Sequence, residues 1–207
     1  MIDTILFHIG ERPVLLMDLL TSVLGLTCVV LAGRNSKYNF WVGYLYTAAL
    51  FVLFWKRNLL AMLLLQPVSL AINVLGHYRW THPREEERSS ADGKSLKVSM
   101  LSWPQRILAV GSVLMVAAVW GLLLDRMYPA DPHPYLDCCV TALILMAQLL
   151  SAMKKWDCWI AWLGVNCTQI ALHLAVGNFF MSLVSGLYLV NGLWSLWTWL
   201  KLYKKKA

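Results

Sequence analysis

The sequence predicts an all-α membrane protein with seven transmembrane helices, and its composition is the first support for this fold class. Of the 207 residues, 59% are hydrophobic and only 14% are charged, whereas a soluble domain averages about 45–50% and about 25%. The mean hydropathy is +0.58. Eleven Trp and eight Tyr suit aromatic belts at two membrane interfaces. These values exclude a disordered chain and argue against a water-soluble enzyme.

Seven apolar runs are the second support, because a helix needs roughly 20 apolar residues to cross about 30 Å of hydrocarbon. The runs do not alternate polar and apolar residues as the strands of a membrane barrel do. Only a helix satisfies its own backbone in lipid, so each run is read as a helix. The spans are expected at residues 14–33, 38–55, 59–80, 106–124, 135–153, 158–175 and 179–200.

Polar segments separate consecutive runs and set their ends. Residues 1–13 lack a basic n-region, so no cleavable signal peptide is expected before the first run. The first run ends at Gly33-Arg34-Asn35-Ser36, the second at Lys56-Arg57-Asn58, and a polar stretch from His82 to Lys97 follows the third. The remaining breaks are Asp125 to Pro134, Lys154-Lys155 and Gly177-Asn178.

The distribution of basic residues is the third observation, and it predicts the orientation. With the C-terminus in the cytoplasm, fourteen Lys and Arg lie on the inner side and four on the outer side. The N-terminus is therefore expected outside and the C-terminus in the cytoplasm of a multi-pass membrane protein. Lys56 and Arg57 fall on the outer side, against this trend.

The order of the spans predicts a 3+1+3 arrangement. A single central helix brings both three-helix units into the membrane from the same side, which predicts parallel repeats with a site where they meet at mid-membrane. Pairing residues 59–80 with 178–199 aligns Trp80 with Trp199. The expected units are a first three-helix unit (14–80), a connecting region (81–134) with a cytoplasmic loop, a linker helix (106–124) and an outer loop, a second three-helix unit (135–200), and a basic tail (201–207).

Polar side chains inside the spans are the candidate site, since such residues are costly in hydrocarbon and tend to face a bundle interior or a cavity. Helical spacing places them in stripes on four of the expected helices. The stripes are Tyr46 in the second span, Gln66, Ser69 and Asn73 in the third, Asp137, Thr141 and Gln148 in the fifth, and Trp159, Trp162, Asn166 and Gln169 in the sixth.

Structural interpretations compete with binding at each of these positions. A lone carboxamide often joins neighbouring membrane helices, and Trp159 begins near an interface where belt aromatics occur. Asp137 follows the outer loop closely enough to cap a helix. His77 and His173 are more simply packed core histidines. Convergence of carboxamides from three helices with two indoles favours a binding site.

The chemistry of these side chains restricts the ligand. Carboxamides donate and accept hydrogen bonds, and indole faces stack on flat rings or cations. Lys and Arg do not lie deep in any span, and Asp18 is the acid nearest the middle of one. A neutral or cationic aromatic solute with hydroxyl groups is therefore expected, rather than an anion. The chain has no catalytic motif and no metal spacing, so it is expected not to be an enzyme and to need no cofactor, metal or nucleic acid.

These residues resemble the PnuC family of vitamin transporters over about residues 14 to 200. In the second half the match comprises Pro134-Tyr135-Leu136-Asp137, Ala147-Gln148, Lys154-Lys155, the W-x-x-W of Trp159 to Trp162, Asn166 and Met181-Ser182-Leu183. In the first half it comprises Asp18, Gly25, Asn39, Gly43, Gln66, Asn73, Gly76 and Trp80.

The resemblance implies a fold like that of the sugar-transporting SWEET proteins and facilitated diffusion of nicotinamide riboside, trapped inside by phosphorylation for NAD biosynthesis. Trp159, Trp162 and Asn166 would hold the nicotinamide ring and ribose, and Gln66, Asn73 and Gln148 would add polar contacts. The expected partners are this small-molecule vitamin, the lipid bilayer and further copies of the chain in a homo-oligomer, with a trimer as the candidate.

Three positions depart from the family pattern, and several alternatives stay open. His77 replaces an aromatic residue, Val184 a common Glu and Ser195 a Gly. Because these positions line the core, thiamine or riboflavin is an alternative substrate. A proton-coupled variant through Asp18, His77 or Asp137 is conceivable. A further alternative is a membrane scaffold without a solute pathway, in which the polar stripes only join helices.

Overall fold

The computed structural model is mostly helical and describes residues 4–9, 12–57, 60–89, 93–127 and 134–205. Seven helices lie in this described part, close to the seven expected spans. The helices are α1 (Leu16–Gly33), α2 (Tyr38–Lys56), α3 (Leu60–Thr81), α4 (Trp103–Met127), α5 (Pro134–Ala152), α6 (Asp157–Ala175) and α7 (Phe179–Lys204), with a short 3-10 helix η1 (Glu85–Glu87) after α3. Four of them, α1, α4, α6 and α7, are long and apolar enough by composition to cross a membrane.

The N-terminal segment corrects the all-α expectation. It forms an antiparallel hairpin of β1 (Ile5–Ile9) and β2 (Arg12–Leu15), with Ile5 opposite Leu15 and Ile9 opposite Arg12. Residues 14 and 15, expected in the first span, belong to this hairpin. Strands and helices can both begin with a short apolar stretch, so hydropathy alone does not separate them. The linker helix also begins three residues earlier than expected, at Trp103.

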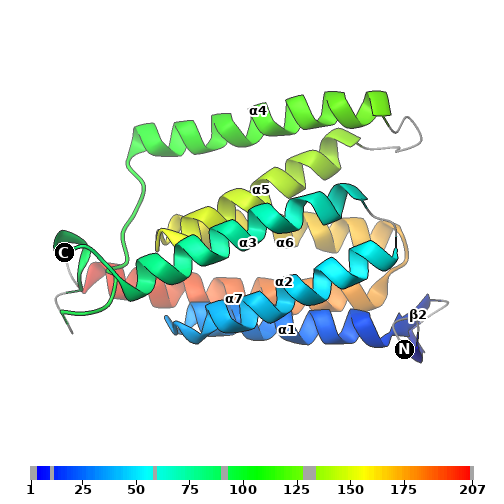
Figure 1. The fold of residues 1–207 in the computed structure, drawn as a ribbon, viewed down its shortest axis with the longest axis horizontal. Coiled ribbons are helices and arrows are strands. Elements are labelled where there is room, and N and C mark those ends of the chain that lie inside the picture. Colours follow the sequence, from blue (N-terminus) through cyan, green and yellow to red (C-terminus); the bar gives the residue numbers. More distant parts are fainter. Residues whose placement is uncertain (1–3, 10–11, 58–59, 90–92, 128–133, 206–207) are drawn as a thin grey trace.

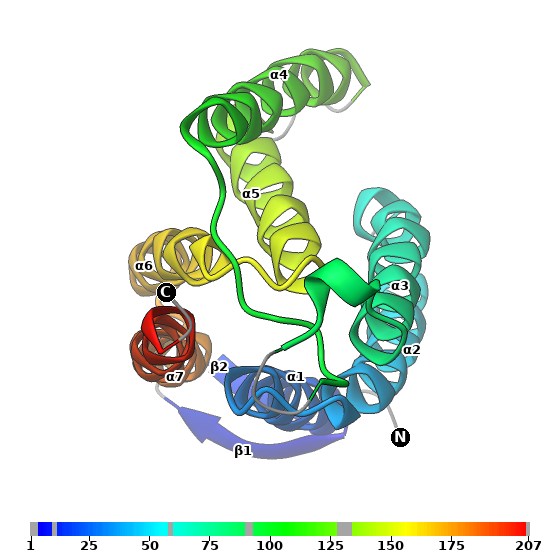
Figure 2. The same cartoon turned by 90° about the vertical axis from the view of Figure 1, so that its left-hand side faces the viewer.

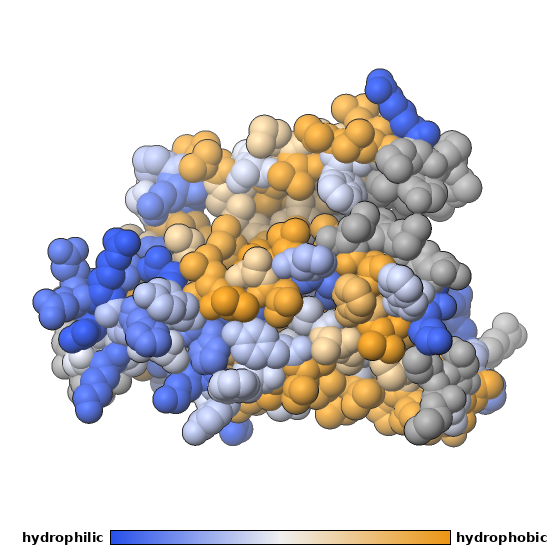
Figure 3. Space-filling view, viewed as in Figure 1, coloured by the Kyte–Doolittle hydropathy of each residue, from blue (hydrophilic) through white to orange (hydrophobic). Residues whose placement is uncertain are grey.

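Six helices form a ring (Figure 2). Contacts run from α1 to α2, α2 to α3, α3 to α5, α5 to α6, α6 to α7 and from α7 back to α1. α4 lies outside the ring and packs along α5 (Figure 1). Apolar side chains cover much of the outer flank of the helices, whereas the end of the molecule near the C-terminus is hydrophilic (Figure 3). This distribution fits a bundle surrounded by lipid.

Matching aromatic contacts occur in α1–α3 and α5–α7, at the end of the ring where α1, α3, α5 and α7 finish. Trp80 meets Phe40 edge to face with centroids 5.1 Å apart, and Trp199 meets Trp159 in the same way at 5.5 Å. Trp80 and Trp199 each also donate the indole N–H to the adjacent helix of the other group of three. Trp80 donates to the Ser151 carbonyl at 3.3 Å and Trp199 to the Gly33 carbonyl at 3.2 Å.

The two turns next to these contacts also match. Asn35 between α1 and α2 has φ 60°, and Lys154 between α5 and α6 has φ 57°. The left-handed conformation is readily adopted by Asn but is unfavourable for Lys. Lys154 is therefore held there by its surroundings.

Small residues let the helices approach closely on both sides of the ring. On one side, Gly33 of α1 faces Ser195 of α7; on the other, Gly76 of α3 faces Ala152 of α5. The alignment that pairs Trp80 with Trp199 also pairs Gly76 with Ser195 and Gly33 with Ala152. Each contact therefore joins a glycine to another small residue. In the first contact the glycine is at the 33/152 position, and in the second it is at the 76/195 position.

A Gly33→Ala substitution is expected to destabilise the protein by about 1 kcal/mol, as overpacking a tight contact does. The new Cβ would overlap the Ser195 hydroxyl and lie 3.0 Å from the Ser195 Cβ. Adding Ser195→Gly reproduces the Ala152–Gly76 arrangement and should restore the melting temperature. Thermal unfolding monitored by tryptophan fluorescence measures both effects. A double variant that melts no higher than the single one would contradict this account of the contact.

Candidate substrate-binding site

A cavity of about 540 Å³ lies inside the ring and is lined by all six of its helices. Pockets for small organic ligands typically measure about 300–1,000 Å³. Its lining begins at Asn39 and Trp159, in the first turns of α2 and α6, and extends to Met62 and His173 near the other end of the ring. The cavity therefore follows the length of the helices.

Most of the residues predicted for the site share this cavity. The lining includes Tyr46 of α2, Gln66, Ser69 and Asn73 of α3, Thr141 and Gln148 of α5, and Trp159, Trp162, Asn166 and Gln169 of α6. Asp137 belongs to the first turn of α5, and its side chain lies outside the described part of the structure. Helical periodicity thus placed the predicted residues of α2, α3, α5 and α6 that the structure describes on faces that line the cavity.

The α6 stripe presents side chains of different accessibility. Trp162 is half-buried, whereas Trp159 is only 2% exposed and packs against Trp199. The Trp159 indole N–H is buried and has no partner among the described residues, and Asn166 is 7% exposed. Trp162 is therefore the indole most available to a ligand, while Trp159 forms the wall near one end of the cavity.

Two carboxamides of α3 also support the interpretation of such residues as helix contacts. Asn73 donates from Nδ2 to the Phe40 carbonyl at 3.2 Å and passes close to Gly43, where a Cβ would lie 2.8 Å from Nδ2. Gln66 donates from Nε2 to the Met62 carbonyl of its own helix at 3.2 Å. Each carboxamide offers two N–H bonds and one carbonyl oxygen, so these contacts leave groups for a ligand.

Asn39 and Tyr188 are among the polar lining residues that the predicted site set omits. Asn39 is buried, and its Oδ1 has no partner among the described atoms. Its separation of seven residues from Tyr46 on α2 was a usable signal. Tyr188 of α7 packs its hydroxyl against α1 at Gly25, where a Cβ would overlap that hydroxyl. A tyrosine far from both ends of an apolar span was the corresponding signal.

Asp18 does not belong to the cavity, because it lies in the first turn of α1. There it pairs with Arg57 at 2.9 Å, between Oδ1 and Nη2. The two residues line a second hollow of about 250 Å³ with Arg12 and Asn178. The ion pair with Asp18 accounts for Arg57, one of the two basic residues that run against the predicted charge distribution. It also removes Asp18 as the counter-ion of a ligand in the main cavity.

His77 is a packed histidine, in agreement with the simpler expectation. Its Nδ1 lies 3.0 Å from the Tyr44 hydroxyl, and its ring stacks on Phe40 with centroids 5.4 Å apart. It does not line the cavity, whereas His173 does.

The described cavity lining contains no Asp, Glu, Lys or Arg. A phosphate group would therefore lose its water without gaining a cationic partner, which is costly. Among the residues that the structure describes, no group of three or more His, Cys, Asp or Glu could hold a metal ion. The arrangement is suited to holding a small uncharged or cationic molecule through amides and aromatic faces.

These features define a multi-pass membrane protein whose apolar helices surround a cavity of small-molecule size. The chain belongs to the nicotinamide mononucleotide transporter family, whose model matches residues 15–201. It is accordingly a membrane transporter by family, as the resemblance to PnuC proteins implied.

The chain is similar to curated transporters over most of their length. It is 24% identical to the nicotinamide riboside transporter PnuC of Escherichia coli K12, covering 88% of this chain and 85% of the relative. It is 28% identical to the riboflavin/roseoflavin transporter RibM of Streptomyces davaonensis, covering 93% and 88%. The crystal structure of the vitamin B3 transporter PnuC has the same fold, with a TM-score of 0.72 at 23% identity over 90% of this chain and 81% of that one.

Proposed function

We propose that this protein facilitates the uptake of nicotinamide riboside. The observation that carries the proposal is the uncharged cavity lined by Trp162, Gln148 and Asn166. An indole face attracts a flat cationic ring such as the pyridinium of nicotinamide riboside. Carboxamides can pair with its amide and ribose hydroxyls. The absence of a cation from the described lining favours the nucleoside over its phosphorylated form.

The ring of helices supports a mechanism by rocking of two units. We infer a 3+1+3 arrangement in which α1–α3 and α5–α7 are parallel repeats and α4 is the linker. The matching contacts around Trp80 and Trp199 support this division. Movement of one unit against the other would expose the cavity first to one side and then to the other.

Facilitated diffusion needs no ion coupling when the product is removed. Phosphorylation of nicotinamide riboside in the cytoplasm would keep its free internal concentration low and so maintain net uptake. The excess of basic residues supports a C-terminus in the cytoplasm and an N-terminus outside the bacterial inner membrane. The exposed apolar side chains of α4, among them Ile107 and Leu108, are available for contact with other copies in a homo-oligomer, with a trimer as the candidate.

Uptake into proteoliposomes tests the substrate. Labelled nicotinamide riboside should equilibrate across the membrane faster than in protein-free liposomes, and collapse of a proton gradient should not change its rate. Nicotinamide mononucleotide should compete poorly, because its phosphate has no cationic partner in the described lining. A protein that neither binds nor admits nicotinamide riboside would end this assignment, and loss of uptake with the gradient would show proton coupling.

Riboflavin is the second candidate, because the riboflavin/roseoflavin transporter RibM is a relative at 28% identity. A cavity of about 540 Å³ also lies within the range for ligands of that size. Competition between labelled nicotinamide riboside and unlabelled riboflavin or thiamine separates the candidates directly. The vitamin that displaces the label at the lowest concentration is the substrate.

A further inference from the structure

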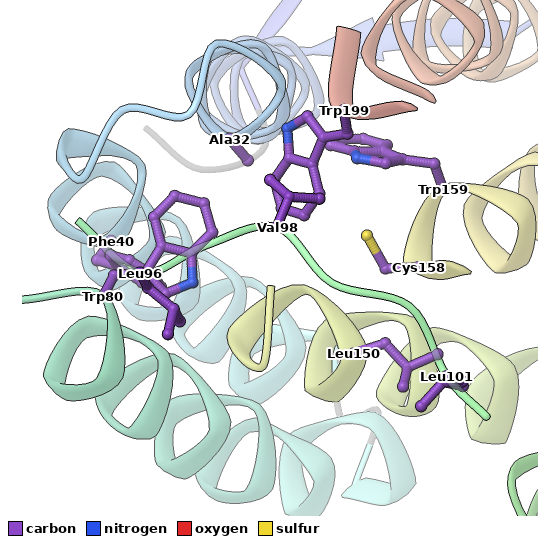
Figure 4. Packing of buried hydrophobic residues seen from close by; sticks show 10 residues of the cluster. All are labelled: Ala32, Phe40, Trp80, Leu96, Val98, Leu101, Leu150, Cys158, Trp159 and Trp199. Atoms are coloured by element: carbon purple, nitrogen blue, oxygen red, sulfur yellow. The ribbon is translucent and has the colours of Figure 1, made fainter. Parts of the chain in front are cut away.

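Residues 93–102, which lead into α4, form a segment that crosses one end of the helix ring (Figure 2). We call residues 94–102 of this segment the strap. Three of its apolar side chains, Leu96, Val98 and Leu101, are buried. They share a cluster with the aromatic residues at the end of the cavity (Figure 4). Phe40 and Trp159 belong both to this cluster and to the cavity lining, so the strap covers the aromatic residues at this end of the cavity.

The strap is fastened to the turn between α5 and α6 through its backbone. Ser99 donates its N–H to the Lys154 carbonyl at 3.1 Å and accepts from the Trp156 N–H at 3.0 Å. This forms a single parallel bridge between Ser99 and Lys155. The contact is one rung long, so separating it exposes few backbone groups.

Side chains of the same turn add further attachments. The Lys154 Nζ donates to the Leu96 carbonyl at 2.6 Å and lies 4.6 Å from the centroid of the Trp80 ring, with the residue only 2% exposed. Asp157 accepts from the Leu101 N–H at 2.9 Å. The Lys155 Nζ donates to the Met100 carbonyl at 3.2 Å. Burial lowers the pKa of the Lys155 ammonium, while Asp157 opposes that shift.

The other end of the strap is tied to α3. The Lys97 N–H donates to the Glu87 carbonyl at 2.8 Å, and the Glu87 carboxylate pairs with Arg79 of α3 at 2.7 Å. The strap thus joins α3 of the first three-helix unit to the α5–α6 turn of the second. Any movement that separates these units at this end must stretch the strap or release one attachment.

We propose that the strap is a gate, which leaves the α5–α6 turn when the cavity opens at this end and returns when it closes. The proposal rests on the proposed transport function for its role, but strap release can be measured without any substrate. Lys154 and Asp157 are positioning residues that set how often the strap is released. Under the orientation proposed above, this gate faces the cytoplasm.

Cys158 provides a native reporter of strap release. Its side chain is fully buried in the cluster beneath the strap. Modification by a small maleimide, read peptide by peptide in the purified full-length protein, should therefore be slow. Lys154→Met removes the ammonium while keeping a long side chain, and it should speed modification by about tenfold, as expected when a local opening becomes more frequent. Lys204→Met, the same change at an exposed position on α7, is the matched control and should have no effect.

A reversible cross-link tests the role of the strap in transport. Ser99 and Lys155 are bridge partners. Paired strands lie about 4.8 Å apart, which is within the Cα range of a disulfide. Oxidised Ser99→Cys/Lys155→Cys protein should bind nicotinamide riboside with unchanged affinity but transport it at least about tenfold more slowly, and reduction should restore uptake. Each variant that carries only one of the two substitutions, treated in the same way, should transport normally.

The outcomes separate the gate from the proposed function. Unchanged uptake through the cross-linked protein would overturn the gate, as would equal Cys158 modification in wild-type and Lys154→Met protein. If the wild-type chain does not transport nicotinamide riboside, the proposed substrate fails, and the cross-link is then tested with the vitamin that it does transport. Faster Cys158 modification in that case still supports a strap that opens.

Discussion

A Trp162→Ala variant is expected to bind nicotinamide riboside about 10- to 100-fold more weakly while remaining folded. Stacking of a base on an aromatic side chain is worth about 1–3 kcal/mol, and each 1.4 kcal/mol is about tenfold in affinity. Trp162 lines the cavity and is half-buried, so its removal takes away a stacking face without emptying the packed cluster at the cavity end. Titration of purified protein with nicotinamide riboside measures the loss.

The matched control is Trp55→Ala, which removes the same side chain from the outer flank of α2, where it is 62% exposed. Affinity should be unchanged in this variant. If the protein were a scaffold without a solute pathway, Trp162→Ala would lower the melting temperature, and neither the variant nor the wild-type protein would bind nicotinamide riboside. Full affinity in Trp162→Ala would remove this indole from the site.

An Asp157→Ala variant is expected to be destabilised by about 3 kcal/mol. Asp157 is buried and accepts from the Leu101 N–H, Arg106 Nε and Arg106 Nη2, each at 2.9 Å. Removing one partner of a buried ion pair costs about 3–5 kcal/mol, and the partial exposure of Arg106 places this case at the lower end. In a chain of this length, the melting temperature should fall by about 6–12 °C.

Thermal unfolding of the variant in detergent checks this value. Asp125→Ala, which removes an exposed carboxylate near the end of α4, is the control and should melt like the wild-type protein. Asp157→Asn keeps an oxygen acceptor for the Leu101 N–H and should lose less stability than Asp157→Ala. Equal melting temperatures for Asp157→Ala and Asp125→Ala would show that the contacts of Asp157 do not hold α6 to the strap and to α4.

Hydropathy and periodicity predicted the helices, and most of the predicted site residues line the cavity. Helix boundaries agree within a few residues at most ends, because polar turns such as Lys154-Lys155 interrupt long apolar runs. The α6 stripe is correct, since residues three or four positions apart share a helix face. The N-terminal hairpin was missed because its pairing depends on backbone hydrogen bonds, which composition does not encode.

The structure was needed to establish where a residue lies along its helix and which distant segments contact each other. Asp18 looked like an acid inside a span, but α1 begins late enough to put it in the first turn, beside Arg57. The Tyr188 hydroxyl packs beside Gly25 of α1, where a larger residue would overlap it. In both cases the contacting residue is far away in the sequence, so the contact could not be predicted from either apolar run alone.

The sequence by itself determined that this chain is a helical membrane protein with amides and indoles aligned on single helix faces, because apolar run length and helical spacing are local properties. Its motifs, rather than these patterns, carried the resemblance to the PnuC family. Only the tertiary structure decided that six helices close a ring, that Asn39 and Tyr188 join the cavity, and that residues 94–102 cover one of its ends. These features arise from packing of side chains and single hydrogen bonds between segments distant in the chain, such as Lys154 Nζ to the Leu96 carbonyl. Their geometry depends on how the helices meet.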